Sequence, residues 1–407
     1  MSEIPYAKSV GISVYLRAGS RFEENPQTEG ISHFLEHMCF KGTARRPNPR
    51  DISFEIDALG GAINAATQRE MTIYYAKVTT EFLEPTLDLM LDMVRHSICV
   101  HEEIERERGV ILEELAAVED SPGELATLLL DSLMWPGQPH GRDIAGTKES
   151  VTSITRDQIL AAYKRQYVAS SAVISIAGAI NPAELHELIN TFVDNWVYGT
   201  PTPWIENVSG SGASSALIAK ETGQAHIALG MPSIGSRNKH RYALNLLSIC
   251  LGEGMSSRLF MRLREELGLC YDIHSYATEL LDTGMFGLYA GVDPKHTFEA
   301  LSEIRRELDR LSTSVSQEEL GRAQAVVRSR IQLQLEDTRA VSGWYGSRAT
   351  LGMPLQTPEE TLALYQSVTI QDIQEIAEQI VQPDNAHLAI VGPFDSATPL
   401  EAAFFES

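Results

Sequence analysis

The chain has 407 residues, 43% of them apolar, which is enough to bury two substantial cores, and no stretch approaches the apolar length of a membrane span. Its formal charge of −22 argues against a nucleic-acid partner and would attract basic peptides instead, although an acidic surface also serves solubility. The four cysteines have no zinc or disulfide spacing and the N-terminus lacks the apolar run of a signal peptide, so we expect a cytoplasmic, reduced protein.

A β-rich run at 10–17 is followed by an H-x-x-E-H motif, which His33, Glu36 and His37 form. On a helix, residues four apart share a face, so the two imidazoles can bind one Zn²⁺ at about 2.0 to 2.1 Å. The carboxylate of Glu36 can then reach a water beside the ion. This order reverses H-E-x-x-H and is typical of inverzincins. The motif therefore predicts a metal-dependent hydrolase.

A catalytic zinc usually has three protein ligands, so the motif needs a third. A second β-rich run at 72–78 and an amphipathic helix at 80–96 precede the acidic segment 102–115, which is predicted to be a helix. Glu107 and Glu114 lie seven positions apart on one stripe of that helix. One of them could bind the metal while the other orients a ligating histidine.

The two halves of the chain repeat each other at a constant offset of 214 residues. Segment 172–178 aligns with 386–392 and segment 75–78 with 289–292, and each pair is typical of a strand. Long amphipathic helices, such as 182–196, alternate with these runs. The pattern predicts an α+β fold made of two homologous domains from a tandem duplication, each a β-sheet with helices packed on one face.

A segment rich in glycine, proline and serine separates the repeats. We therefore expect a zinc-binding domain at 1–200, a linker at 201–216 and a second domain at 217–407. In the second copy, the three positions of the motif are Leu247, Cys250 and Leu251. The second domain is thus predicted to be noncatalytic, with one zinc per chain.

These features resemble the pitrilysin-type inverzincins of peptidase family M16, and most of all the branch of mitochondrial processing peptidases and related bacterial proteases. The segment HFLEHMCFKGT looks like the zinc helix of the family, Glu114 like its distal glutamate ligand and Glu107 like its accessory glutamate. The resemblance covers nearly the whole chain. It implies the processing-peptidase/LuxS-like metallohydrolase fold, with zinc held by His33, His37 and Glu114 and with Glu36 as general base.

The resemblance also implies a zinc-dependent endopeptidase that works as a dimer. In the family, four such domains enclose a chamber, and this chain supplies two, so a homodimer or a heterodimer with a related subunit is expected. In relatives, an arginine and a tyrosine spaced like Arg264 and Tyr271 reach across the chamber toward the substrate. Both groups could stabilise an oxyanion at the site of the partner subunit. Alternatively, Arg264 is a surface ion-pair partner and Tyr271 begins a strand.

The substrate is expected to lie extended beside an edge strand near 60–66, where paired glycines allow close backbone approach. The resemblance assigns this part to Asn64 and Ala65. Two other functions remain open: a noncatalytic structural or assembly subunit of the same fold, and a zinc amidohydrolase acting on small molecules. Noncatalytic members typically lose the metal motif, which is complete here, so a peptidase acting on peptides or leader-type segments is favoured.

Overall fold

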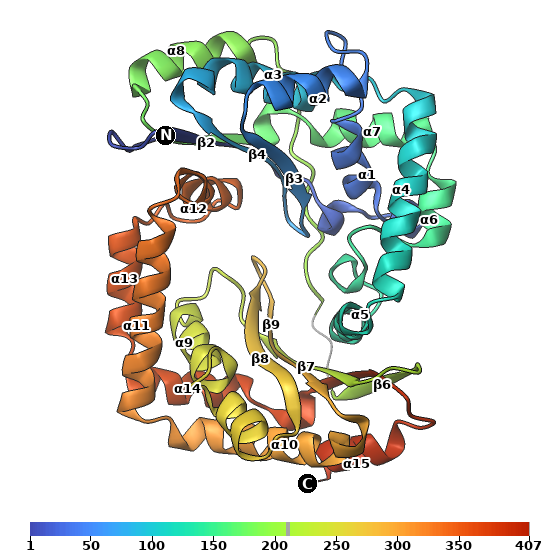
Figure 1. Ribbon diagram of the computed structural model, residues 1–407, viewed down its shortest axis with the longest axis vertical. Coiled ribbons are helices and arrows are strands. Elements are labelled where there is room, and N and C mark those ends of the chain that lie inside the picture. Colours follow the sequence, from blue (N-terminus) through green and yellow to red (C-terminus); the bar gives the residue numbers. More distant parts are fainter. Residues whose placement is uncertain (209–211, 407) are drawn as a thin grey trace. The chain divides into compact units, whose positions relative to one another are not determined.

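The computed structural model describes residues 1–208 and 212–406, and these residues form two compact units. The first unit comprises 1–115, 143–205 and 332–355, and the rest of the described chain belongs to the second (Figure 1). Part of the predicted linker 201–216, residues 209–211, lies outside the described residues. Among the described helices, none combines the length and the apolar composition that crossing a membrane requires.

The sheet of the first unit has five strands in the order β1-β5-β2-β4-β3. Its strands are β1 (Ser2–Glu3), β2 (Ser9–Leu16), β3 (Ala62–Thr67), β4 (Thr72–Thr79) and β5 (Ala172–Gly178). β2 pairs antiparallel with β4 and β5, and the short β1 pairs parallel with β5. β3 pairs antiparallel with β4, and its other side pairs with no described strand, so β3 is an edge strand.

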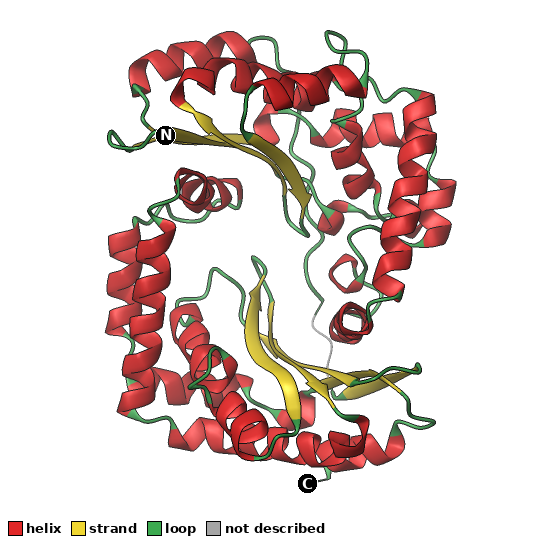
Figure 2. Cartoon of the chain, viewed as in Figure 1, coloured by secondary structure: helices red, strands yellow, loops and turns green. Residues whose placement is uncertain are grey.

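One face of this sheet forms the main core of the first unit, under the helices that Figure 2 shows on that side. These helices are α1 (Ile31–Met38), α2 (Pro49–Ala58), α3 (Leu83–His96), α4 (His101–Glu119), α6 (Lys148–Ser153), α7 (Arg156–Gln166) and α8 (Pro182–Val193). Alternate residues of β4 face this core: Tyr74, Ala76 and Val78 are buried in it. The neighbouring residues between them point to the opposite face and are half-buried.

The opposite face is covered in part by α12 (Thr338–Thr350), which comes from the second half of the chain. A Cβ on Gly11 would lie 2.5 Å from the backbone of Thr338, so the helix approaches β2 as closely as a glycine permits. The Ser342 hydroxyl donates to the Ser175 carbonyl at 2.9 Å, and its Oγ lies 2.7 Å from Ser13 Oγ, within hydrogen-bond distance of that second hydroxyl. Small side chains thus let α12 lie directly on the strands.

The second unit repeats this architecture with a sheet in the order β6-β10-β7-β9-β8. Its strands are β6 (Ser214–Ala219), β7 (Ala225–Ser233), β8 (Cys270–Glu279), β9 (Gly284–Val292) and β10 (His387–Gly392). Its helices are α5 (Pro122–Met134), α9 (Arg241–Gly252), α10 (Thr297–Ser314), α11 (Gln317–Gln334), α13 (Pro358–Ser367), α14 (Ile370–Ile380) and α15 (Thr398–Phe405). The predicted α+β fold with two repeated sheets is confirmed.

The compact units differ from the predicted segments 1–200 and 217–407 at two helices. α5 comes from the first half of the chain but packs on β10 and β7 of the second unit, whereas α12 packs on β2 and β5 of the first. The periodicity of a helix reveals its apolar face but not which sheet that face covers. The exchange of α5 and α12 therefore has no local signal in the sequence.

Candidate metal centre

The N-terminus of α1 is anchored by a buried carboxylate. Gly30 precedes the helix with a φ of +85°, a conformation that suits glycine. The Glu23 carboxylate accepts the N–H groups of Gly30 and Ser32, both at 2.9 Å, and so satisfies donors that have no partner within the first helical turn. Burial raises the pKa of Glu23 to about 7, although these two hydrogen bonds oppose the shift.

The apolar face of α1 determines where its histidines point. Phe34, Leu35 and Met38 are fully buried in the core of the first unit. His33 and His37 lie one turn apart on another face of the same helix and are half-buried. The short amphipathic helix thus presents two imidazoles together, as the motif predicts.

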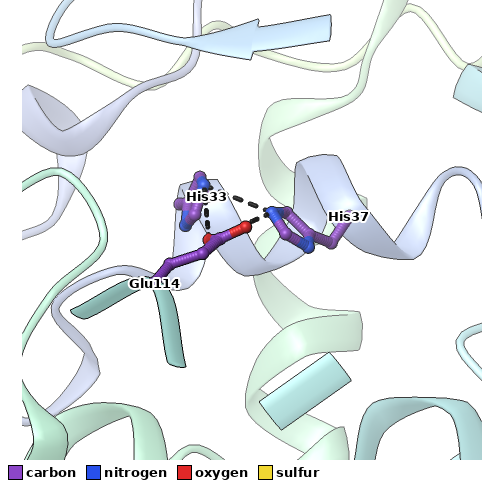
Figure 3. A group of neighbouring side chains, drawn as sticks. All are labelled: His33, His37 and Glu114. Atoms are coloured by element: carbon purple, nitrogen blue, oxygen red, sulfur yellow. Dashed lines mark hydrogen bonds and ion pairs between the residues drawn. The ribbon is translucent and has the colours of Figure 1, made fainter. Parts of the chain in front are cut away.

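Three donor atoms converge at this position (Figure 3). His33 Nε2 lies 3.3 Å from His37 Nε2, and Glu114 Oε2 lies 3.8 Å from the first and 3.7 Å from the second. Two ligands bound at about 2.0 to 2.1 Å to a tetrahedral ion are themselves about 3.3 Å apart. Two imidazole nitrogens and one carboxylate oxygen at these separations fit a catalytic zinc with three protein ligands. Among the described residues, no other three His, Cys, Asp or Glu side chains have their ligand atoms within 4.8 Å of one another.

The two histidines differ in their electrostatic surroundings. Burial lowers the pKa of His33 to about 4, which keeps its imidazole in the neutral form that binds metal. Burial also acts to lower the pKa of His37, but the hydrogen bond with Glu107 and the charge of Glu114 outweigh it, and that pKa is raised. Without an ion, His37 therefore attracts a proton more strongly than His33 does.

Glu107 lies behind His37 and is itself held by a lysine. His37 Nδ1 lies 3.0 Å from Glu107 Oε2, and Lys41 Nζ lies 2.7 Å from Glu107 Oε1. Burial would raise the pKa of Glu107, but the hydrogen bonds with His37 and Lys41 lower it, so the carboxylate stays ionised. An ionised Glu107 fixes Nδ1–H of His37 and leaves Nε2 for the metal. The sequence reasoning identified Glu107 but missed Lys41, which follows His37 by four positions, just after the end of α1.

We predict that Lys41→Met lowers zinc affinity by about tenfold, the lower end of the range for partners of metal ligands. Methionine keeps the apolar stem but leaves the Glu107 carboxylate buried without its cation. Lys41→Arg restores the charge and should retain most of the affinity. Competition with a chromogenic chelator measures the change, and Lys148→Met, at an exposed lysine, is the matched control. Equal affinities for Lys41→Met and wild type would show that Lys41 does not support the site.

Glu36 lies between the two histidines in the sequence and contacts the edge strand. The Thr67 hydroxyl, at the end of β3, donates to Glu36 Oε2 at 2.5 Å. Burial raises the pKa of Glu36, and the hydrogen bond from Thr67 opposes that shift. The Thr67 backbone also forms a hydrogen bond with the Glu36 carboxylate and acts on the pKa in the same direction. The sequence reasoning missed Thr67, because nothing local connects it to α1.

Asn64 and Ala65 lie in the middle of β3, where Asn64 is opposite Tyr75 and Ala65 is opposite Tyr74. Asn64 is exposed and Ala65 is half-buried. Both belong to the edge strand that ends at Thr67, so the open side of β3 leads to Glu36. The structure therefore brings the candidate substrate strand and the candidate base together.

Arg264 and Tyr271 belong to the second compact unit. The Arg264 guanidinium lies 4.8 Å from the centroid of the Tyr271 ring, which is 74% exposed. Tyr271 lies at a register shift of β8, between Cys270 and Asp272. The two side chains thus contact each other, and their role at a zinc site stays a prediction. In the same unit, α9 buries Leu247, Cys250 and Leu251 in place of metal ligands.

Two family models cover most of the chain. Residues 1–148 match the model described as insulinase (peptidase family M16), and residues 153–327 match the peptidase M16 inactive domain. An uncharacterized zinc protease of Streptomyces coelicolor is 34% identical over 398 residues, 96% of this chain and 86% of the relative. One of Bacillus subtilis is 32% identical over 390 residues, 96% of this chain and 94% of the relative.

Solved structures have the same fold. A protease from Helicobacter pylori superposes with a TM-score of 0.91 at 23% identity, over 96% of this chain and 95% of that one. An M16-like peptidase from Alicyclobacillus acidocaldarius gives a TM-score of 0.83 at 23% identity, over 96% and 95%. Nearly full-length relatives above 30% identity and matches to both family domains agree with the geometry of α1 and α4. The chain therefore belongs to peptidase family M16.

Proposed function

We propose that this protein is a zinc-dependent endopeptidase that hydrolyses peptides bound in an extended conformation. The observation that carries the proposal is the convergence of His33, His37 and Glu114, with Glu36 beside them at the end of an open edge strand. A noncatalytic assembly subunit of this fold would have no need for a complete donor set. A small-molecule amidohydrolase would have no need for an open edge strand beside the site, to which an extended peptide can add.

Each side chain of the site has a distinct task. His33, His37 and Glu114 would hold the zinc, which when bound supplies a water of lowered pKa and polarises the substrate carbonyl. Glu36 accepts a proton from the attacking water at Oε1 and delivers it to the leaving amine, while the Thr67 hydroxyl fixes Oε2. Glu107 keeps His37 in the tautomer that leaves Nε2 free of a proton.

The substrate class follows from the strand and the charge. A peptide that adds to the open side of β3, next to Asn64 and Ala65, is recognised mainly through its backbone, so it must be unfolded where it is cut. Small side chains in β3 leave room for substrate side chains. The net charge of −22 favours the approach of basic peptides, including leader-type segments.

We also propose that the active form is a dimer, either of two identical chains or with a related subunit. Arg264 and Tyr271 of one subunit would stabilise the oxyanion at the zinc site of the other. Their stacking supports this role, because it fixes a cation and a phenol side by side. A cytoplasmic location stays a prediction.

The proposal is tested with a mixture of unstructured peptides, some of them basic leader sequences, and with mass-spectrometric mapping of the cuts. We expect internal cleavage that a chelator stops and that added zinc restores. Products trimmed only from their ends would contradict an endopeptidase. Cleavage that the chelator leaves unchanged would contradict the zinc chemistry, and turnover of small amides alone would favour an amidohydrolase.

A further inference from the structure

The outer face of the first sheet, on the side away from α1, carries polar side chains next to the edge strand. Cross-strand register places Asn64 opposite Tyr75 and Ala62 opposite Lys77, and paired residues share a face. Asn64 and Ala62 are exposed, and Tyr75 and Lys77 are half-buried. This part of the sheet is therefore accessible beside the strand along which the substrate would lie.

Arg339, in the first turn of α12, reaches over this face. Its guanidinium lies 4.1 Å from the centroid of the Tyr75 ring, and the residue is exposed. No carboxylate in the described part of the chain pairs with its side chain. The nearby Asp337 carboxylate forms an ion pair with Lys77 at 3.0 Å and accepts the N–H groups of Arg339 and Ala340. The Asp337 side chain is thus paired with Lys77, and the Arg339 guanidinium forms no ion pair with a described residue.

The backbone around Arg339 is fixed. A Cβ on Gly11 would lie 2.5 Å from Arg339 N, so this turn of α12 rests directly on β2. The Thr338 and Ser9 hydroxyls are 3.0 Å apart and form a hydrogen bond. A guanidinium on an anchored turn, with one face on an aromatic ring, loses little freedom on binding and keeps its in-plane N–H groups available. Such a fork matches a carboxylate, which it can bind through two parallel hydrogen bonds.

We propose that Arg339 and Tyr75 form a subsite that binds one acidic side chain of the peptide substrate. The proposal rests on the proposed function, because it takes β3 as the strand to which the peptide adds. Side chains of an added strand alternate between the two faces, so every second one points to the face of Arg339. The added strand lies two strand spacings from β4, roughly 9.6 Å, which the long side chains of arginine and glutamate span together.

The subsite changes the expected substrate class. The acidic surface as a whole attracts basic peptides, but a local cation selects a carboxylate at one position. The preferred substrate is therefore a basic, unfolded peptide with a single glutamate or aspartate at a fixed distance from the cut. The alternation of the strand predicts that a second acidic residue next to the first brings no gain, since it points to the other face.

The test uses a peptide whose cut site the mapping experiment has defined, with each position in turn replaced by glutamate, glutamine or lysine. In wild type, we expect glutamate to exceed glutamine in kcat/KM by roughly tenfold at one position, the low end for hydrogen bonds to charged groups. Arg339→Gln should abolish this preference, and Arg339→Glu should replace it with a preference for lysine. Arg339→Lys should keep part of it.

Arg50 provides the matched control. It is also exposed and stacks on an aromatic ring, that of Phe54 at 4.8 Å, but it lies on α2 in the helix layer. Arg50→Gln and Arg50→Glu make the same changes in net charge and should leave the preference unchanged. Fluorescence anisotropy of the labelled peptides on zinc-loaded Glu36→Gln protein measures the same preference as a difference in binding affinity, independently of turnover.

The outcomes separate the two proposals. If zinc-loaded wild type does not cut the parent peptide, the proposed function fails and the subsite fails with it. If the parent peptide is cut but no position prefers glutamate, or if Arg339 and Arg50 variants change the preference equally, the subsite alone is wrong. Thermal melting of each variant confirms that it is folded, and the reversal in Arg339→Glu cannot result from a loss of fold.

Discussion

Replacement of Glu36 by glutamine is expected to lower kcat for peptide cleavage by about 10²- to 10⁴-fold, the contribution of a positioned general base. Glutamine has the shape of glutamate, and its amide can still accept the hydrogen bond from Thr67. It cannot accept the proton of the attacking water. Glu36 is not among the three converging donors, so the variant should still bind zinc.

Mass spectrometry of the intact protein measures its zinc content, and cleavage of one defined peptide measures its activity. Together they separate loss of the base from loss of the metal. Glu24→Gln, at an exposed glutamate of the same unit, makes the same change of charge and should retain wild-type rates. Substantial turnover by Glu36→Gln that is fully loaded with zinc would contradict the assignment of the base. Loss of zinc from this variant would mean that Glu36 supports the metal itself.

Local spacing accounts for the parts of the site that the sequence predicted. His33 and His37 are one turn apart on a single helix, so their proximity depends only on α1 being a helix. Glu107 and Glu114 share a stripe of α4 for the same reason. That α4 faces α1 is a tertiary fact, and only the resemblance to known peptidases supplied it.

The residues that sequence reasoning missed depend on contacts between distant elements. Lys41 supports the site only because the fold brings it into contact with Glu107, which lies 66 positions later in the sequence. Thr67 contacts Glu36 only because β3 packs beside α1. Neither residue type is rare enough to stand out in a sequence. A lysine or a threonine has no spacing rule that would connect it to a histidine motif.

Element boundaries were predicted well where alternation is strong. The run at 10–17 corresponds to β2 (Ser9–Leu16) and the run at 72–78 to β4 (Thr72–Thr79). The predicted helix at 80–96 begins instead with a 3-10 turn and becomes α3 only at Leu83. Helix ends depend on capping contacts, which the apolar period does not record.

Glu114 is assigned as the third zinc ligand, and Glu113 beside it on α4 is the same residue type but points in another direction. Glu113 and Glu114 are both exposed, but Glu114 lies on the stripe of Glu107 and has Oε2 within 3.8 Å of both imidazoles. Glu114→Gln should weaken zinc binding by more than the roughly 100-fold that loss of a supporting partner costs. Glu113→Gln should bind zinc as wild type does.

Chelator competition gives the affinities, and the rise in melting temperature on adding zinc gives an independent readout, since a ligand that binds only the folded state stabilises it. Wild type and Glu113→Gln should show the rise, and Glu114→Gln should not at the same zinc concentration. If Glu113→Gln alone loses zinc, the third ligand is the neighbouring residue and α4 is rotated in solution. If both variants bind zinc as wild type does, the two histidines hold the ion without α4. The proposed catalytic centre then has no third protein ligand, and this contradicts the hydrolase proposal.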